Sequence, residues 1–315
     1  MPQSVRAVVV DPSHSDKLML QSVALPSAAP DDVTVRVTAI SLNRGEVNRA
    51  LSQPTAGARP GWDFAGVIDE RGSDGSGPPV GTRVVGMLGT GAWAERIRAP
   101  SHAVAALPAN VTDAQAATLP VAGLTALHAL RQGGLLLGRK VLVDGTTGGV
   151  GHLAIQLAAA AGADVYGHVR RADQRGMIAE WCGDRIIVAA DLRAAAASGP
   201  YHLILDSVGG SALSAALTML QPNGTCVTFG VSEAPTTTFE SGAFFRQGGV
   251  RLTASSCFTS CALWNPRVRA LYCSRQKSRA VGCARISRSR RLGPILPLSP
   301  AASSRASSSA RPCCT

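Results

Sequence analysis

Short runs of alternating apolar and polar residues, interrupted by Pro and Gly, dominate the N-terminal third of the chain. Residues 33–40 keep this alternation for most of their length, which is typical of a strand with one buried face. Comparable runs lie at 5–11, 64–70, 83–88 and 92–99. Thr112 then precedes a helical run as a predicted N-cap, and a second helical run ends at two glycines. The pattern therefore predicts a β-rich first domain over residues 1–121.

The pattern changes after residue 140, where apolar runs alternate with helical stretches. The runs with strand character lie at 141–145, 164–169, 185–190, 201–208 and 224–230. Regular alternation of strands and helices is typical of a doubly wound parallel sheet. We therefore predict an α/β protein whose second domain, residues 122–253, has this architecture.

Residues 254–315 show neither period and are rich in Arg and Ser. Their apolar residues form no continuous face, so burial cannot offset the loss of chain entropy on folding. Charge divides at the same place: residues 1–253 carry 20 basic and 20 acidic side chains, whereas the remainder carry 11 basic side chains and no acidic one. The formal net charge of +11 thus belongs entirely to a tail that we expect to be irregular and disordered.

A net charge of this size usually indicates an anionic partner. Arg-rich segments neutralise phosphates, so a nucleic-acid-associated protein is one functional hypothesis. No interleaved aromatic residues or RNA-binding motif accompany the charge, and we expect no specific nucleic-acid partner. No apolar run reaches the roughly 18 residues that a membrane span requires, and the first residues lack a signal-peptide pattern. We therefore expect a cytoplasmic protein without a membrane partner.

A glycine-rich turn follows the first apolar run of the second domain, with the spacing G-x-x-G-x-x-G over residues 145–151. It opens a run with helical apolar period, a context typical of a dinucleotide-binding turn. Gly148 would let the backbone approach a pyrophosphate, Gly151 would let the helix pack on the strand, and free N–H groups would meet the anion. A turn that only joins strand to helix is the alternative. The candidate cofactor-binding residues are Gly145, Thr147, Gly148, Gly149, Val150 and Gly151.

The choice of cofactor depends on the end of the next strand, where an acidic residue usually binds the ribose of NAD. This chain has His168, Val169, Arg170 and Arg171 there. Without a carboxylate to repel it, a 2′-phosphate could pair with Arg170 or Arg171. We therefore predict NADPH rather than NADH and leave open which arginine contributes. Solvated surface arginines are the alternative.

Three further motifs follow the same order along the chain: GWDFAGVI at 61–68, AGLTAL at 122–127 and LDSVGG at 205–210. Together with the glycine-rich turn, they resemble the medium-chain dehydrogenase/reductase superfamily, and especially its zinc-free quinone oxidoreductase-like branch. The resemblance covers residues 5 to about 253. It implies a GroES-like first domain, a Rossmann cofactor domain, a homodimer, and hydride transfer from NADPH to a quinone or an α,β-unsaturated carbonyl.

Zinc-dependent members of that superfamily have a Cys ligand where this chain has Asn43 and a His ligand where it has Trp62. No Cys lies near Ala122 and Gly123, where a third ligand would be expected. Asn and Trp do not replace the usual ligands of zinc. We therefore expect no catalytic metal, and without one the substrate must already be electrophilic.

The resemblance also implies three residues near the cofactor. Asn43 would face the nicotinamide end of the cleft and donate to the developing oxygen charge of the substrate. Thr125 would lie beside the nicotinamide, and Gly230 would lie in the loop that passes the cofactor. A turn-forming Asn43 and a Thr125 bonded within its own helix are the alternatives.

Members of the superfamily continue past residue 254 with an edge strand, helices and a final strand, whereas this chain departs from the pattern there. Residues 310–315 can be encoded by codons whose shifted frame reads Gly-Lys-Ala-Val-Leu-His, which resembles the GKAVL ending of the family. We therefore expect a frameshift near residues 253–257. The nucleotide sequence tests this, because an alternate frame without the reductase pattern refutes it. An inactive cofactor-binding remnant is accordingly an alternative function.

Overall fold

The computed structural model describes residues 3–257, and the predicted tail from residue 258 onward lies outside them. The first part contains β1 (Ser4–Val10), β2 (Leu18–Ala24), β3 (Asp32–Ile40), α1 (Arg44–Ser52), β4 (Asp63–Glu70), β5 (Arg83–Met87), β6 (Arg96–Pro100), β7 (Val104–Ala106) and α2 (Asp113–Ala117). The second part contains α3 (Pro120–Arg131), β8 (Lys140–Val143), α4 (Gly149–Ala160), β9 (Asp164–Val169), α5 (Ala179–Cys182), β10 (Ile186–Val188), β11 (Tyr201–Asp206), α6 (Gly210–Thr218), β12 (Leu220–Thr228), α7 (Ser241–Arg246) and β13 (Arg251–Ala254).

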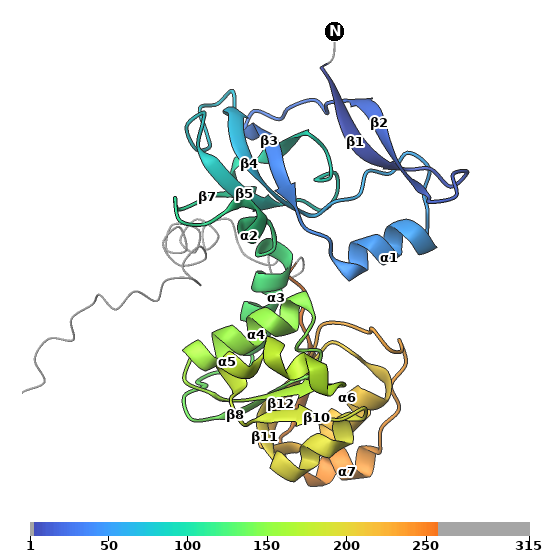
Figure 1. The fold of residues 1–315 in the computed structure, drawn as a ribbon, viewed down its shortest axis with the longest axis vertical. Helices are drawn as coiled ribbons and strands as arrows, with labels where there is room; N and C mark the ends of the chain where they lie inside the picture. The colour runs from blue at the N-terminus through green and yellow to red at the C-terminus, as the bar shows by residue number, and fades with distance from the viewer. Residues whose placement is uncertain (1–2, 258–315) are drawn as a thin grey trace, which may run out of the picture.

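Strands β3 to β7 form an antiparallel sheet in the order β6-β3-β4-β5-β7, while β1 and β2 form a separate hairpin (Figure 1). Val33, Val35, Phe64 and Ile68 are almost fully buried in one core, which agrees with the alternation in the sequence. The sequence pattern does not predict β2, because none of its side chains is fully buried. Strand β2 is stabilised instead by its antiparallel pairing with β1.

The helices near the junction of the two parts begin and end as the sequence predicts. Thr112 Oγ1 accepts a hydrogen bond from Gln115 N at 3.2 Å, and Gln115 Oε1 accepts one from Thr112 N at 3.1 Å, so both residues cap α2. Helix α3 ends just before Gly133. No helix within residues 3–257 is long and apolar enough to cross a membrane.

The second part is a parallel sheet in the order β10-β9-β8-β11-β12-β13. The chain runs from β8 outward to β10, returns to the centre at β11 and runs outward on the other side. Helices α3, α4 and α5 cover one face and α6 covers the other (Figure 1). Val141 and Val143 lie in the first core and Leu142 lies in the second, because alternate side chains of a strand point to opposite faces. The predicted α/β fold with a doubly wound sheet is confirmed.

Candidate active site

The carboxyl ends of the central strands bring buried polar side chains to one edge of the six-stranded sheet. Asp144 follows β8, His168 lies near the end of β9, and Asp206 ends β11. Each of them is at most 5% exposed. In doubly wound sheets a dinucleotide binds at this edge, where the strand order reverses. The glycine-rich turn, directly after β8, lies at the same edge.

The inner side of this turn leaves no room for side chains. Gly145 has a φ of +75°, and a Cβ at this position would overlap Ser207 Oγ. A Cβ on Gly151 would overlap the carbonyl oxygen of Gly145, so glycine is needed for α4 to approach β8 this closely. These two glycines therefore determine the shape of the turn.

The outer side of the turn is open. Thr147, Gly148 and Gly149 are exposed, while Val150 packs against the core of the second part. A Cβ on Gly149 would meet only Ala122 Cβ, at 3.7 Å. Helix α4 has 12 residues and no side-chain cap at Gly148, so its first-turn N–H groups are available to an anion. The turn therefore fits a pyrophosphate.

Thr146 is a residue of the turn that sequence reasoning missed. It is fully buried, and its Oγ1 donates to the carbonyl oxygen of His168 at 2.7 Å. Asp144 and His168 were also not assigned from the sequence, although their side chains lie 2.8 Å apart. Buried polar residues next to a phosphate-binding turn are the only signal that could have identified them, and burial is not visible in the sequence.

The two candidate arginines directly after β9 are both exposed, but they differ in their partners. Arg171 forms two hydrogen bonds of 3.0 Å to the carboxylate of Asp173. This hydrogen-bonded ion pair raises the pKa of Arg171 and lowers the pKa of Asp173. Within residues 3–257, the side chain of Arg170 forms no hydrogen bond or ion pair. Arg170 is therefore the more available of the two.

Asn43 lies at the N-terminus of α1, between two buried carboxylates. Its Nδ2 group donates to Asp63 Oδ2 at 2.7 Å and to Glu46 Oε1 at 2.9 Å. Glu46 Oε1 also accepts the backbone N–H of Asn43 at 2.8 Å, and Asp63 Oδ1 accepts the N–H of Val121 at 2.9 Å. The Nδ2 group of Asn43 is thus fully engaged, so a substrate oxygen would have to replace one of its acceptors.

Burial changes the acidity of both carboxyl groups. Asp63 has no exposed surface, and desolvation raises its pKa to about 7, although hydrogen bonds from Asn43 and Val121 oppose this shift. Desolvation also raises the pKa of Glu46. Sequence reasoning did not assign these acids to the site: Glu46 in the first turn of a helix has an ordinary structural explanation, and the burial of Asp63 in β4 is not visible in the sequence. The cluster can hold a proton near neutral pH.

Two contacts connect the Asn43 cluster with the second part. Val121, the backbone donor to the cluster, lies in the first turn of α3. The guanidinium of Arg44 donates to the carbonyl oxygen of Ser232 at 3.2 Å, in the loop after β12. Gly230 lies in that loop, and a Cβ on it would lie 2.8 Å from the carbonyl oxygen of Ser207. The loop therefore packs closely on the end of β11.

The structure brings together only some of the predicted site residues. Thr125 is 6% exposed in α3, one turn after Val121, so it lies inside the helix packing. Gly230 approaches the glycine-rich turn through Ser207, which both of them contact. Arg170 follows β9, on the opposite side of β8 from β12. An extended dinucleotide at the turn would therefore have its two ends on different sides of β8.

The residues at the expected zinc positions do not fit a catalytic zinc ion. Within residues 3–257, no group of three or more His, Cys, Asp and Glu side chains is arranged to hold a metal. Among the described residues, Glu46 and Asp63 are the acids bound to Asn43, and both accept hydrogen bonds from its amide. Two carboxylates without a Cys or His do not make a zinc site of the usual composition.

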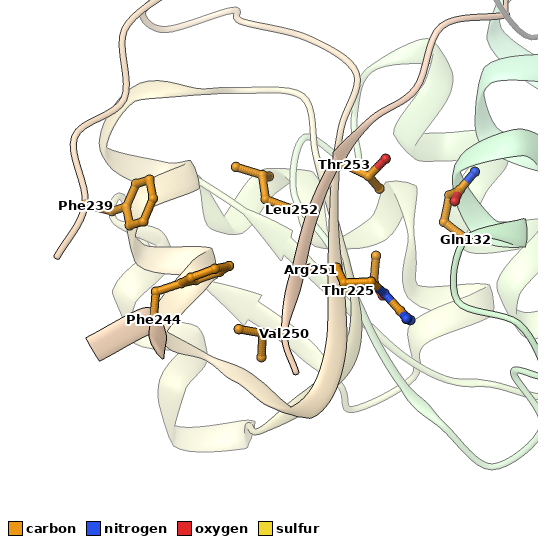
Figure 2. Close-up of a pocket in the computed structure, with 8 residues that line it drawn as sticks. All are labelled: Gln132, Thr225, Phe239, Phe244, Val250, Arg251, Leu252 and Thr253. Atoms are coloured by element: carbon orange, nitrogen blue, oxygen red, sulfur yellow. The ribbon is translucent and has the colours of Figure 1, made fainter. Parts of the chain in front are cut away.

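A cavity of about 710 Å³ flanks the edge strand β13, away from the glycine-rich turn. Figure 2 shows its apolar residues, among them Phe244 and Leu252, on one side of the strand and polar residues, among them Thr225 and Arg251, on the other. Arg251 Nε donates to Thr225 Oγ1 at 3.2 Å. None of the predicted site residues lines this cavity, so it is separate from the candidate active site.

Comparison with known proteins finds a matching family model for each of the two parts of the chain. Residues 29–109 match the family model "Alcohol dehydrogenase GroES-like domain", and residues 149–266 match "Zinc-binding dehydrogenase". The second match extends past the predicted boundary at residue 254. A mycocerosic acid synthase-like polyketide synthase of Mycobacterium tuberculosis is 37% identical over 212 residues, which are 64% of this chain and 10% of that protein. The chain thus spans about a tenth of the length of the curated relatives it matches.

Solved structures give the same result for the fold. The quinone oxidoreductase of Pseudomonas syringae pv. Tomato DC3000 is 25% identical, with a TM-score of 0.74 over 86% of this chain and 88% of that one. CurK enoyl reductase is 22% identical, with a TM-score of 0.74 over 87% and 88%. A cobalt- and zinc-bound alcohol dehydrogenase of Pyrobaculum aerophilum is 22% identical, with a TM-score of 0.71 over 87% and 90%. With its GroES-like part, its doubly wound sheet and its glycine-rich turn, the chain belongs to the medium-chain dehydrogenase/reductase superfamily of nicotinamide-dependent oxidoreductases.

Proposed function

We propose that the chain is a zinc-independent oxidoreductase that transfers a hydride from NADPH to a quinone or an α,β-unsaturated carbonyl compound. The observation that carries the proposal is the open glycine-rich turn together with Arg170 directly after β9, where no acidic residue ends the strand and where Arg170 has no side-chain partner within residues 3–257. His168 is near the position where an acidic side chain would bind ribose, and its ring faces Asp144 instead. The nicotinamide cofactor supplies the hydride when bound.

Two groups of residues would hold the cofactor. The exposed backbone of Thr147, Gly148 and Gly149 would bind the pyrophosphate with the N-terminal N–H groups of α4. Arg170 would pair with the 2′-phosphate through charge-assisted hydrogen bonds. Arg171 would contribute less, because its guanidinium is already bound to a carboxylate.

Asn43 is the proposed donor to the substrate oxygen on which negative charge develops. It can release its side-chain bond to Glu46, because Glu46 Oε1 would still accept the backbone N–H of Asn43. The bond to Asp63 would keep the amide oriented. Thr125 is proposed to lie beside the nicotinamide and Gly230 in the loop that passes the cofactor, as the resemblance to the superfamily implies.

The lack of a zinc-ligand set among the described residues supports the proposed substrate class. Without a metal to activate an alcohol or polarise a carbonyl, the acceptor carbon must be electrophilic by itself. Quinones and enones meet this condition. The similarity to a quinone oxidoreductase and to an enoyl reductase supports the same classes of substrate.

Oxidation of NADPH, followed by its absorbance with panels of quinones and enones, tests the proposal. We expect turnover with at least one class and a lower Kd for NADPH than for NADH. Failure to bind NADPH would refute the proposal. Binding without turnover on any acceptor would favour the alternative, an inactive cofactor-binding remnant.

A further inference from the structure

A buried acid–histidine pair connects strand ends at the edge of the sheet that carries the glycine-rich turn. Asp144 Oδ1 lies 2.8 Å from His168 Nδ1, and each side chain is 5% exposed. His168 Nε2 lies 2.9 Å from the carbonyl oxygen of Ala189, which follows β10. The imidazole ring therefore connects the ends of three neighbouring strands, β8, β9 and β10.

Both ring nitrogens of His168 have a hydrogen-bond partner. The carbonyl oxygen of Ala189 can only accept, so Nε2 is the donor in that contact. Asp144 Oδ1 accepts the backbone N–H of Gly145 at 2.8 Å and lies within hydrogen-bond distance of His168 Nδ1. Hydrogen bonds are directional, so these two contacts hold the ring in one orientation.

Further hydrogen bonds extend this connection to the backbone on both sides. Thr146 Oγ1 donates to the carbonyl oxygen of His168 at 2.7 Å, and Ala189 N donates to the carbonyl oxygen of Val169 at 3.1 Å. Arg170 follows immediately. Contacts that meet at His168 therefore help to hold its position relative to the glycine-rich turn, in addition to the pairing of β8 with β9.

We propose that the Asp144–His168 pair is a positioning unit for cofactor selectivity, which holds the arginine segment at a set distance from the glycine-rich turn. A dinucleotide could then place its pyrophosphate at the turn and its 2′-phosphate at Arg170 simultaneously. This inference rests on the proposed use of NADPH. Neither side chain needs to touch the cofactor, because both act through the backbone segments that they join.

The test compares two probes of the adenosine half of the site, 2′,5′-ADP and 5′-AMP, by calorimetric titration of the full chain. The ratio of their Kd values measures 2′-phosphate recognition separately from binding of the remaining nucleotide. We expect the wild-type chain to bind 2′,5′-ADP more tightly. His168→Asn is expected to reduce the ratio by about tenfold, the size of one charge-assisted hydrogen bond, with less than about a threefold change for 5′-AMP.

Asp144→Asn tests the same pair with a side chain of the same shape. An asparagine oxygen can still accept the N–H of Gly145, but the amide carries no negative charge, so its contact with His168 Nδ1 is weaker than that of a carboxylate. This variant also serves if His168→Asn does not fold. The double variant is expected to lower the ratio no further than the single variants do. The effects of two residues that act as one unit are not additive.

His202→Asn is the matched control. His202 also makes two hydrogen bonds, to the carbonyl oxygen of Gly133 at 2.7 Å and to Gln221 Nε2 at 3.2 Å, but it lies at the amino end of β11. This variant should leave the ratio unchanged. A ratio that is retained in His168→Asn and Asp144→Asn, or that falls equally in His202→Asn, overturns the positioning role alone. A wild-type chain without preference for 2′,5′-ADP overturns the proposed use of NADPH together with this inference.

Discussion

Asn43 Nδ2 donates to Asp63 Oδ2 at 2.7 Å, and this hydrogen bond joins the N-terminus of α1 to the first residue of β4. Strands β3 and β4 pair with Ile40 opposite Phe64, so the residues that follow β3 return to the start of β4. The bond is made between a neutral donor and a fully buried acid. The Asn43 side chain, the proposed donor to the substrate, therefore also contributes to the stability of the first part.

Removing this donor should reduce both stability and activity. Asn43→Ala is expected to lower the free energy of unfolding by about 1–3 kcal/mol, because two buried carboxyl groups lose a shared donor. It should also lower kcat while the Kd of NADPH stays unchanged. Urea denaturation and steady-state kinetics measure these effects. Asn48→Ala, at an exposed position of the same helix, should change neither, and equal losses in the two variants would contradict the prediction.

The raised pKa of Asp63 makes stability depend on pH. Its carboxyl group has an ordinary pKa of 3.8 and a pKa of about 7 in the folded protein, where burial disfavours the charged form. Between these values the folded state binds more protons than the unfolded state. The free energy of unfolding should therefore fall as pH rises from about 4 to about 7, by up to about 1.4 kcal/mol per pH unit.

Urea denaturation at several pH values, with the wild-type chain and Asp63→Asn, isolates this contribution. Subtracting the two profiles removes the titration of other groups. Burial raises the pKa of Glu46 as well, so Glu46→Gln should show a change in the same direction. A difference between the wild-type chain and Asp63→Asn that does not vary over this range would show that Asp63 titrates normally.

Arg170 should contribute more to NADPH binding than Arg171. Arg170→Ala is expected to raise the Kd of NADPH about ten- to hundredfold and to leave the Kd of NADH nearly unchanged, because only the 2′-phosphate loses a partner. Arg171→Ala should have a smaller effect, since this guanidinium is bound to Asp173. Fluorescence titration of the nicotinamide measures both constants. If Arg170→Ala raised the Kd of NADH as much as the Kd of NADPH, Arg170 would not be a specific partner of the 2′-phosphate.

Two glycines of the turn should respond differently to alanine. Gly151→Ala would place a Cβ against the carbonyl oxygen of Gly145, and such overpacking costs about 1–3 kcal/mol of stability. Gly149→Ala meets only Ala122 Cβ at 3.7 Å and should leave stability unchanged, although it can hinder the pyrophosphate. Thermal unfolding with and without NADPH separates the two effects. A stable Gly151→Ala protein would show that the turn can move.

Interactions between neighbours in the chain can be predicted from the sequence. The capping pair Thr112 and Gln115 is three residues apart, and the alternation of apolar runs with helical stretches predicts the parallel sheet. The glycine spacing over 145–151 likewise predicts the turn, because its constraints lie within a few residues. Strand β2 could not be predicted in this way, since only its pairing with β1 stabilises a half-exposed segment.

The partners of the buried polar groups were decided by the tertiary structure. Asp144 and His168 are 24 residues apart, and they meet because β8 and β9 pair with Val143 opposite Gly167. In a parallel pair, opposite residues point to the same face, and a shift of one residue would separate the two side chains. Buried strands are continuous apolar runs that carry no mark of this register. The sequence by itself thus determined most of the elements and the glycine-rich turn, whereas packing of the whole sheet decided which distant side chains form hydrogen bonds.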